Sequence, residues 1–486
     1  MSIKSNFWVI VFVVILFSLF VWPQATARAN LPIIEVSGNI TTDTTWTSSN
    51  IYVITGHLTI DEHITLTIHQ GTIIKFDGNK LMAVNGKLIV QGTPSNPVYI
   101  TSLKDDTLGG DTNGDGVASS PQPGDWGHIN FRDPSTDAEN LIENTVIQYG
   151  GYFNAYRYEY YDCYNCAYHG VLRFEGSSPT IRNNTLQNNV GYALTGDVNS
   201  YPVVSNNTIL ENGGNGLEIR GGTFSNDLPV VRYWHNTDIV YAITGHITIP
   251  TGITLVVDPG VIIKVSSNKL IGVNGVLKLG VPITTQASAA FENDLLFIPD
   301  AAFHIYLPLV FTLPRPVYIT SLKDDTLGGD TNGDGVASSP QPGDWGHINF
   351  RDSSTDAENL IENTVIQYGG YFNAYHNEYY DCYNCAYHGV LRFEGSSPTI
   401  RGNQVRYNNY GLFTTNGALP LVTNNAIYKN EYYGFYNEDS GVVVKAENNW
   451  WGAVSGPYHS SNPGGTGNQV SNNVDFKPWL SASPVQ

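Results

Sequence analysis

The sequence contains few charged residues, and few of those are basic. Asp, Glu, Lys and Arg make up only 14% of its 486 residues, and 43 acidic against 24 basic residues give a formal net charge of −19. Nucleic acids bind through their phosphates and require a basic surface, so this balance argues against a nucleic-acid partner and against an anionic membrane. It fits an extracellular protein, and one that collects cations.

Catalytic signatures are also lacking. The chain contains no G-x-S-x-G, no H-E-x-x-H, no P-loop and no dinucleotide fingerprint in a strand–helix context. Its 2 methionines and its 12 histidines, which do not cluster tightly, argue against copper delivery. We therefore assign no catalytic residue from the sequence.

The N-terminus has the three parts of an export signal. Lys4 supplies a positive charge, an apolar run extends over residues 7–22, and residues 25–27 (A-T-A) form a small-x-small cleavage site. An uncleaved anchor is the alternative, but the run has 16 residues whereas a spanning helix needs about 20. We expect a signal peptide over residues 1–27 and a secreted or cell-surface protein without membrane contact after cleavage.

Long internal repeats dominate the rest of the chain. Residues 97–182 recur at 316–401 with three of 86 positions changed, and residues 53–91 recur at 242–280 with 20 of 39 positions identical. The two spacings differ because the second copy carries an insertion near 281–315. Repetition of this kind is typical of solenoids.

A shorter period lies within these repeats. The segment 179–184 (P-T-I-R-N-N) is followed 23 residues later by 202–207 (P-V-V-S-N-N), and 398–403 is followed 22 residues later by 420–425. The short apolar pairs predict strands, and the asparagines predict corners, because Asn tolerates a left-handed backbone. One period therefore corresponds to one turn of a β-solenoid, with stacked asparagines forming a ladder.

Several motifs resemble the bacterial right-handed parallel β-helix repeat proteins, which share a fold with pectate lyases and NosD proteins. These motifs are I-T-G-H-[LI]-T-I, G-x-I-I-K, V-N-G-x-L, P-V-Y-I-T-S, G-D-W-G-H-I, S-P-T-I-R-x-N and N-N-W-W-G-x-x-S-G-P. The resemblance implies an all-β, right-handed parallel β-helix but no particular activity, since such folds host lyases, hydrolases, epimerases and adhesins. We expect one repeat block over 28–235, a second over 236–447 that includes the insertion, and a C-terminal cap over 448–486.

The segment 111–116 (D-T-N-G-D-G), repeated at 330–335, matches the first half of a calcium loop, with oxygen ligands at positions 1, 3 and 5 and Gly at 6. Position 12 is Gln122 rather than Glu, and Asp105 and Asp106 lie upstream where a carboxylate can complete the shell. A polar surface turn is the alternative. We expect structural calcium, with these candidate ligands: Asp105, Asp111, Asn113, Asp115, Asp324, Asp330, Asn332 and Asp334.

Eight tyrosines fall within residues 149–168, and the second copy keeps seven of them. Tyrosine has a rigid apolar face and a polar tip, which suits the faces of sugar rings; the alternative is that these rings pack on one another and on the adjacent coil. Glycan is thus a possible partner. The candidate binding residues are Tyr152, Tyr156, Tyr160, Tyr161, Tyr371, Tyr375, Tyr379 and Tyr380.

The same segments each contain a C-x-x-C pair. Cys163 and Cys166 recur as Cys382 and Cys385. A local disulfide in each pair is favoured because the chain is exported. A metal site and free thiols are the alternatives, although a zinc site needs about four ligands.

Our leading hypothesis is a non-enzymatic protein that binds carbohydrate, as an adhesin does, or serves a structural role, with calcium stapling its loops. The alternative is a lyase or hydrolase of an extracellular polysaccharide, and a spacer without further ligands is a third possibility. A lyase needs acidic residues that bind calcium beside an Arg or Lys base, and a hydrolase needs two facing carboxylates. The available groups are Asp125, Arg132, Asp133, Arg173, Glu175, Asp344, Arg351, Asp352, Arg392 and Glu394.

Overall fold

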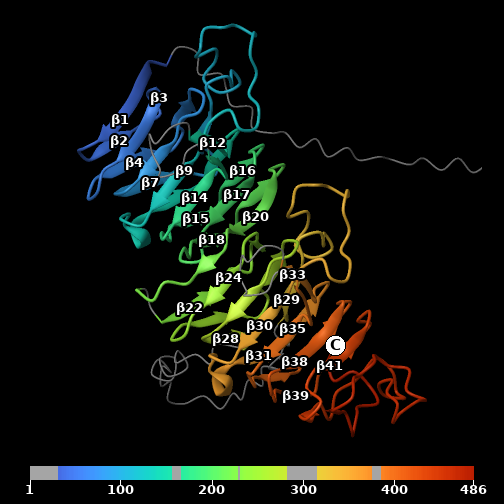
Figure 1. Ribbon diagram of the computed structural model, residues 1–486. Helices are drawn as coiled ribbons and strands as arrows, with labels where there is room; N and C mark the ends of the chain where they lie inside the picture. The colour runs from blue at the N-terminus through green and yellow to red at the C-terminus, as the bar shows by residue number, and fades with distance from the viewer. Residues whose placement is uncertain (1–30, 156–165, 228–229, 282–314, 375–384, 486) are drawn as a thin grey trace, which may run out of the picture.

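The computed structural model describes residues 31–155, 166–227, 230–281, 315–374 and 385–485. It is a rod of stacked coils, in which the strands of one coil pair in parallel with those of the next (Figure 1). Two antiparallel hairpins, β12 (Tyr152–Ala155) with β13 (Cys166–His169) and β33 (Tyr371–Ala374) with β34 (Cys385–His388), stand outside this stack. Within the described residues, the only helices are the 3-10 helices η1 (Asp137–Glu139) and η2 (Asp356–Glu358), and no helix is long and apolar enough to cross a membrane. The fold is therefore a parallel β-helix. The expected signal peptide and nearly all of the expected insertion lie outside the described residues.

Each coil contributes strands to three faces, which we call faces 1, 2 and 3. Strand β3 bends at a corner, so its first part lies on face 1 and its second part on face 2. On face 1 of the first half lie β1 (Ile33–Ile40), β3 (Ile51–Ile60), β5 (Ile73–Phe76), β8 (Val98–Ser102), β11 (Thr145–Gln148), β16 (Thr185–Gln187) and β19 (Thr208–Leu210). On face 2 lie β6 (Met82–Val84), β9 (Ile129–Arg132), β14 (Leu172–Glu175), β17 (Tyr192–Gly196) and β20 (Gly214–Ile219). On face 3 lie β2 (Thr44–Trp46), β4 (Thr65–His69), β7 (Lys87–Gln91), β10 (Leu141–Glu143), β15 (Thr180–Arg182) and β18 (Val203–Ser205).

The second half repeats this arrangement. Face 1 contains β23 (Tyr241–Ile243), β26 (Ile262–Val265), β29 (Val317–Ser321), β32 (Thr364–Gln367), β37 (Gln404–Arg406) and β40 (Ala426–Tyr428). Face 2 contains β21 (Gly222–Thr223), β24 (Ile247–Ile249), β27 (Ile271–Val273), β30 (Ile348–Arg351), β35 (Leu391–Glu394), β38 (Tyr410–Thr415) and β41 (Tyr433–Asn437). Face 3 contains β22 (Val231–Trp234), β25 (Thr254–Val257), β28 (Val276–Leu279), β31 (Leu360–Glu362), β36 (Thr399–Arg401) and β39 (Leu421–Thr423).

Inward side chains stack in register to form the core. On face 3, Val90, Ile142, Ile181 and Val204 occupy successive coils and are all buried. Burying one such aliphatic side chain contributes about 1.5–3 kcal/mol. Because the register repeats at every coil, a stack of short strands builds one continuous core along the rod.

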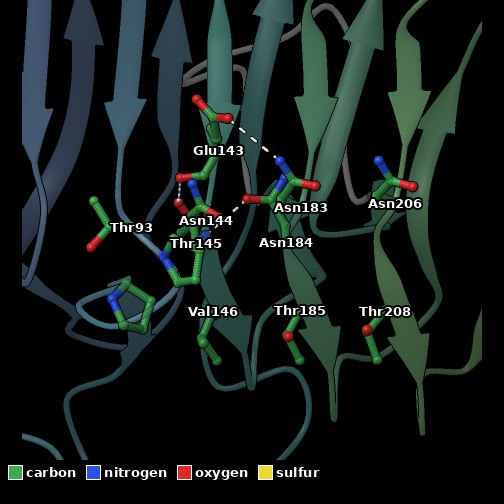
Figure 2. Close-up of a pocket in the computed structure, with 12 residues that line it drawn as sticks. Thr93, Glu143, Asn144, Thr145, Val146, Asn183, Asn184, Thr185, Asn206 and Thr208 are labelled. Atoms are coloured by element: carbon green, nitrogen blue, oxygen red, sulfur yellow. Dashed lines mark hydrogen bonds between the residues drawn. The ribbon is translucent and has the colours of Figure 1, made fainter.

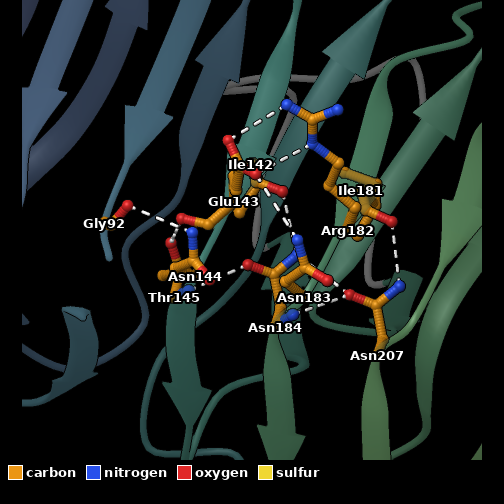
Figure 3. A network of polar contacts seen from close by, with 10 residues as sticks. All are labelled: Gly92, Ile142, Glu143, Asn144, Thr145, Ile181, Arg182, Asn183, Asn184 and Asn207. Carbon is orange, nitrogen blue, oxygen red and sulfur yellow. Dashed lines mark hydrogen bonds and ion pairs between the residues drawn. The ribbon is translucent and has the colours of Figure 1, made fainter. Parts of the chain in front are cut away.

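The asparagine ladder expected from the N-N motif is present at the corner between faces 3 and 1 (Figure 3). The side-chain amide of Asn184 donates to the carbonyl of Ile142 at 2.9 Å and to Oδ1 of Asn207 at 3.0 Å, and its own Oδ1 accepts from the backbone amide of Thr145 at 2.9 Å. Its neighbour Asn183 has a φ of 57°, the left-handed conformation that the corner requires. Asn184 therefore joins its own coil to both neighbouring coils.

The stacking changes at the junction of the two halves, which we call the seam. Strand β20 lies on face 2 of the first half, where it pairs with β17, but its other neighbour is β23 on face 1 of the second half. Face 1 of the first half ends at β19. The loop 322–347 of the second half closes this step: the amide of Asn215 donates to the carbonyl of Thr331 at 2.9 Å, and its side chain donates to the carbonyl of Asp330 at 3.0 Å.

Residues from 448 onward cover the last coil. Trp451 is fully buried, and Val470 forms a β-bridge with Phe435 of β41. Strands β42 (Val444–Lys445) and β43 (Val474–Asp475) pair in parallel beside it. The exposed end of the core is thereby covered by aromatic and aliphatic side chains.

Candidate functional site

Each half carries a long acidic loop between face 1 and face 2, over residues 103–128 and 322–347. Carboxylate oxygens of Asp106, Asp111 and Asp115 lie within 4.8 Å of one another in the first loop. The second loop brings carboxylate oxygens of Asp325, Asp330 and Asp334 together within the same distance. In each half, the two carboxylates of the D-x-N-G-D-G segment thus lie close to each other and to one carboxylate from upstream.

Several oxygens in these clusters are buried and accept no hydrogen bond. They are Oδ1 of Asp106 in the first loop, and Oδ1 of Asp325, Asn332 and Asp334 in the second. Partial desolvation, followed by the charge of Asp111, raises the pKa of Asp106, and Asp325 is affected in the same way beside Asp330. A buried oxygen without a partner is costly, and oxygen ligands of this kind suit Ca²⁺.

Two of the predicted ligands lie elsewhere. The carboxylate of Asp105 is buried, and it accepts from Thr101 at 2.7 Å and from the side-chain amide of Gln148 at 3.0 Å. Asp324 has the same partners in the second half, Thr320 and Gln367. These two carboxylates anchor the bases of the loops, and the adjacent residues Asp106 and Asp325 join the clusters instead. Asn113 lies in its cluster, where its side-chain amide donates to Asp115 at 2.9 Å.

A buried lysine fixes each acidic loop to face 1. Lys75 is fully buried, and its ammonium group donates to the carbonyls of Asp105 and Gly110 at 2.8 and 3.1 Å and to the hydroxyl of Thr112 at 2.7 Å. Burial lowers the pKa of Lys75, and the nearby Asp105 opposes that shift. Lys264 has the same position in the second half and donates to the carbonyl of Gly329 at 2.6 Å.

The predicted tyrosine loops are antiparallel hairpins at their described bases. These are β12 (Tyr152–Ala155) with β13 (Cys166–His169), and β33 (Tyr371–Ala374) with β34 (Cys385–His388). Tyr371 is 38% exposed and Tyr152 is half-buried. The other candidates, Tyr156, Tyr160, Tyr161, Tyr375, Tyr379 and Tyr380, lie outside the described residues, as do Cys163 and Cys382. The two disulfides therefore remain predictions.

Below each hairpin, a phenylalanine packs on two histidines. The ring of Phe153 meets His57 and His128 edge-on, with centroids 5.5 and 5.4 Å apart. His128 is fully buried, and its pKa is held well below the usual value by burial first and by the positive charge of Arg173 next. Phe372 packs on His246 and His347 in the same way. The hairpins are thus rooted on the rigid coils.

Face 2 of the first half carries a charged row next to this root. Nε of Arg173 forms an ion pair with Glu175 at 2.8 Å, and the side-chain amide of Asn130 donates to the same carboxylate at 3.0 Å. Arg220 donates to Thr195 at 2.9 Å. Burial, and then the charge of Arg173, lowers the pKa of Arg220 to about 10. Arg173 and Glu175 are two of the acid and base candidates that the sequence suggested, and Arg220 is an arginine that the sequence analysis did not select. The candidates Asp125 and Asp344 lie elsewhere, paired with Lys104 at 2.8 Å and with Lys323 at 2.7 Å.

The second half keeps Arg392 and Glu394, and the side-chain amide of Asn349 donates to Glu394 at 3.1 Å. The next two coils differ, because Phe413 and Tyr436 stand where the first half has Thr195 and Glu218. Tyr410 stacks on His388 at 4.7 Å and on Tyr432 and Tyr433 at 5.4 and 5.6 Å between ring centroids. Tyr436 stacks on Phe413 at 5.4 Å. Sequence reasoning missed this group because its members come from successive coils, 22 or 23 residues apart. The signal was the repetition of aromatic residues at the solenoid period.

A shallow groove follows the corner of the first half shown in Figure 2. Thr185 and Thr208 point outward one coil apart on its floor, below Asn183. Its carboxylate, Glu143, is paired with Arg182 at 3.0 Å. Among the described lining residues the groove has no second carboxylate, so it offers no pair of acids facing each other.

Two family models match the chain. One, described as a pectate-lyase-like β-helix domain, matches residues 38–152, and the other, described as a right-handed β-helix region, matches residues 130–232 and 346–482. Together with the parallel coils, these matches define a right-handed parallel β-helix. The chain belongs to the right-handed β-helix repeat proteins, with a pectate-lyase-like β-helix domain in its first half. Neither a curated protein nor a solved structure matches it.

Proposed function

We propose that this chain is a secreted or cell-surface, non-enzymatic carbohydrate-binding protein whose acidic loops are stapled by calcium. The observation that carries the proposal is the pairing of an acidic loop with a tyrosine-bearing hairpin at one root, repeated in both halves. At this root the amide of Gly124 donates to the carbonyl of Gly150 at 3.2 Å, and that of Tyr152 donates to Trp126 at 3.3 Å. The second half has the equivalent bond from Gly343 to Gly369 at 3.1 Å.

Calcium has a structural role in this proposal. Asp111, Asn113, Asp115 and Asp106 would supply oxygen ligands in the first loop, and Asp325, Asp330, Asn332 and Asp334 in the second. Calcium prefers six to eight oxygen ligands, so backbone carbonyls and water would complete the shell. Neutralising three close carboxylates would hold the loop in one conformation beside the hairpin.

Retention on polysaccharide tests the carbohydrate-binding role. We expect the mature protein to migrate more slowly in native gels that contain a neutral polysaccharide, such as xylan, galactomannan or hydroxyethylcellulose, when calcium is present. A chelator should reduce that retardation, because the loops support the hairpin roots. Migration that none of these polysaccharides alters would overturn the proposal.

The charged row of the first half favours the alternative, a polysaccharide lyase, because Arg220, which is half-buried and has a lowered pKa, is suited to act as a base. This alternative predicts new unsaturated ends when the protein is incubated with a polyuronate and calcium. Those ends should disappear in the variant Arg220→Ala. Their absence with the unaltered protein would eliminate the alternative.

A further inference from the structure

A continuous strip of aromatic side chains runs along the rod at the start of face 2 in the second half. We call it the aromatic platform; its members are Tyr371, His388, Tyr410, Tyr432, Tyr433 and Tyr436. The rings of Tyr371 and His388 lie 5.8 Å apart, and Tyr410 continues the strip on the next coil. Tyr432 is 51% exposed, and Tyr410, Tyr433 and Tyr436 are half-buried. The strip therefore presents ring surface to solvent along three successive coils.

The first half lacks this platform although its hairpin is almost identical in sequence. Tyr410 pairs with Tyr433, but its counterpart Tyr192 pairs with Gly214. A Cβ atom at Gly214 would lie 2.5 Å from the ring of Tyr192, so that ring lies down over the glycine. Of the two halves, only the second therefore forms the aromatic platform.

The second column of rings differs between the halves in the same way. Phe413 pairs with Tyr436 in the second half, whereas the equivalent pair in the first half is Thr195 with Glu218. The guanidinium carbon of Arg392 lies over the ring of Phe413, 4.8 Å from the ring centroid. Arg392 is buried, so its positive charge is not exposed on the strip. Two nearly identical hairpins therefore stand beside a polar floor in one half and an aromatic floor in the other.

The chemistry of the strip fits a chain of pyranose rings. Stacked aromatic faces pack against the C–H faces of sugars, while the tyrosine hydroxyls and neighbouring amides bond the sugar hydroxyls. Asn409 and Glu431 lie along its edge, joined by a hydrogen bond of 3.2 Å. The exposed carboxylates of Glu431 and Glu438 disfavour a polyanion, which favours a neutral polysaccharide as ligand.

The narrowness of the strip argues against a protein as its occupant. A tyrosine presents about 150–250 Å² when fully buried, so these partly exposed rings offer roughly 400 Å². A stable protein interface needs about 800 Å² from each partner. A linear ligand can use a strip one or two rings wide.

We propose that the aromatic platform is the glycan-binding site of this protein, and that it holds one neutral polysaccharide chain lying along the rod axis. This proposal rests on the carbohydrate-binding function proposed above and assigns it to the second half. The first half, with Thr195, Gly214 and Glu218 at the equivalent positions, does not take that ligand.

The test replaces platform residues with the residues that the first half carries at the same places. The double variant Tyr433→Gly with Tyr436→Glu is compared with the unaltered full-length protein by native gels containing xylan, galactomannan or hydroxyethylcellulose, with calcium. We expect affinity to fall at least tenfold in the variant. The matched control is Tyr458→Ala, which removes a tyrosine that is 50% exposed in the cap and should leave retardation unchanged. A second variant, Tyr432→Ala, keeps the test valid if the double variant melts at a lower temperature.

The outcomes separate the two proposals. If the unaltered protein is retarded and both platform variants are retarded equally, the platform is overturned while carbohydrate binding stands. If no polysaccharide retards the unaltered protein, both proposals fail. If the variants instead change the sedimentation coefficient of the free protein, the strip is an interface between copies of this chain, and the assignment to glycan is overturned.

Discussion

Asn215 and Asp330 lie 115 residues apart in the sequence, yet the side-chain amide of Asn215 donates to the backbone carbonyl of Asp330 at 3.0 Å. This hydrogen bond joins the last face 2 strand of the first half to the acidic loop of the second half. The first acidic loop has the same sequence but packs near the N-terminal end of the rod, where Leu108 contacts Ile51 and Ile73. Two loops of identical sequence therefore have different structural roles: the first packs on the N-terminal coils, and the second closes the seam.

This difference predicts unequal effects of calcium ligands on stability. We expect Asp334→Asn to lower the melting temperature in calcium more than Asp115→Asn, because the second loop closes the seam. A ligand at 100 times its Kd stabilises by about 2.7 kcal/mol, which sets the scale of the loss. Differential scanning calorimetry with calcium and with excess chelator makes the comparison. Equal shifts for the two variants, or no shift with chelator, would contradict it.

The asparagine ladder predicts a large cost for removing one member. Asn184→Ala deletes a buried amide that serves Ile142, Asn207 and Thr145, and each partner left unsatisfied costs about 1–3 kcal/mol. We expect destabilisation at the upper end of that range, measured by urea unfolding. The control is Asn183→Gly at the adjacent corner position, which keeps the left-handed conformation and should change stability by only a few tenths of a kcal/mol.

The buried histidines predict a loss of stability in mild acid. Burial holds the pKa of His128 and of His347 well below the usual value, so the unfolded chain binds more protons than the folded chain below pH of about 6.5. The contribution of these two histidines to the free energy of unfolding is fully present above that pH. It declines as the pH falls toward their lowered pKa in the folded state. Melting temperatures between pH 7.5 and 5.5 should fall less steeply in the double variant His128→Gln with His347→Gln. Parallel slopes would show that other groups control this range.

The coil structure could be predicted because its determinants are local. Strand pairs and corner asparagines recur every 22 or 23 residues, and each coil repeats the same hydrogen bonds. The acidic clusters could be predicted for the same reason, since Asp111, Asn113 and Asp115 lie within one short segment. The choice of Asp106 over Asp105 could not, because it depends on which side of the loop faces Thr101 and Gln148.

Features that depend on the relation between coils could not be placed from the sequence, even where aromatic residues repeat at the solenoid period. The platform joins Tyr410 to Tyr433 across a coil, and whether their rings meet depends on the exact register of β38 and β41. The change of face at β20 depends on a strand that pairs differently on its two sides. A period shows that coils stack, but it does not reveal where the stacking changes.

The seam also has a consequence for how the rod would respond to mechanical load. A solenoid pulled from its ends unravels one coil at a time, since each coil is held mainly by its neighbours. At β20 the regular succession stops, and the next barrier is a long loop hydrogen-bonded across the step rather than another coil. Extension in an optical trap should therefore pause once near the middle of the chain, and calcium should lengthen that pause.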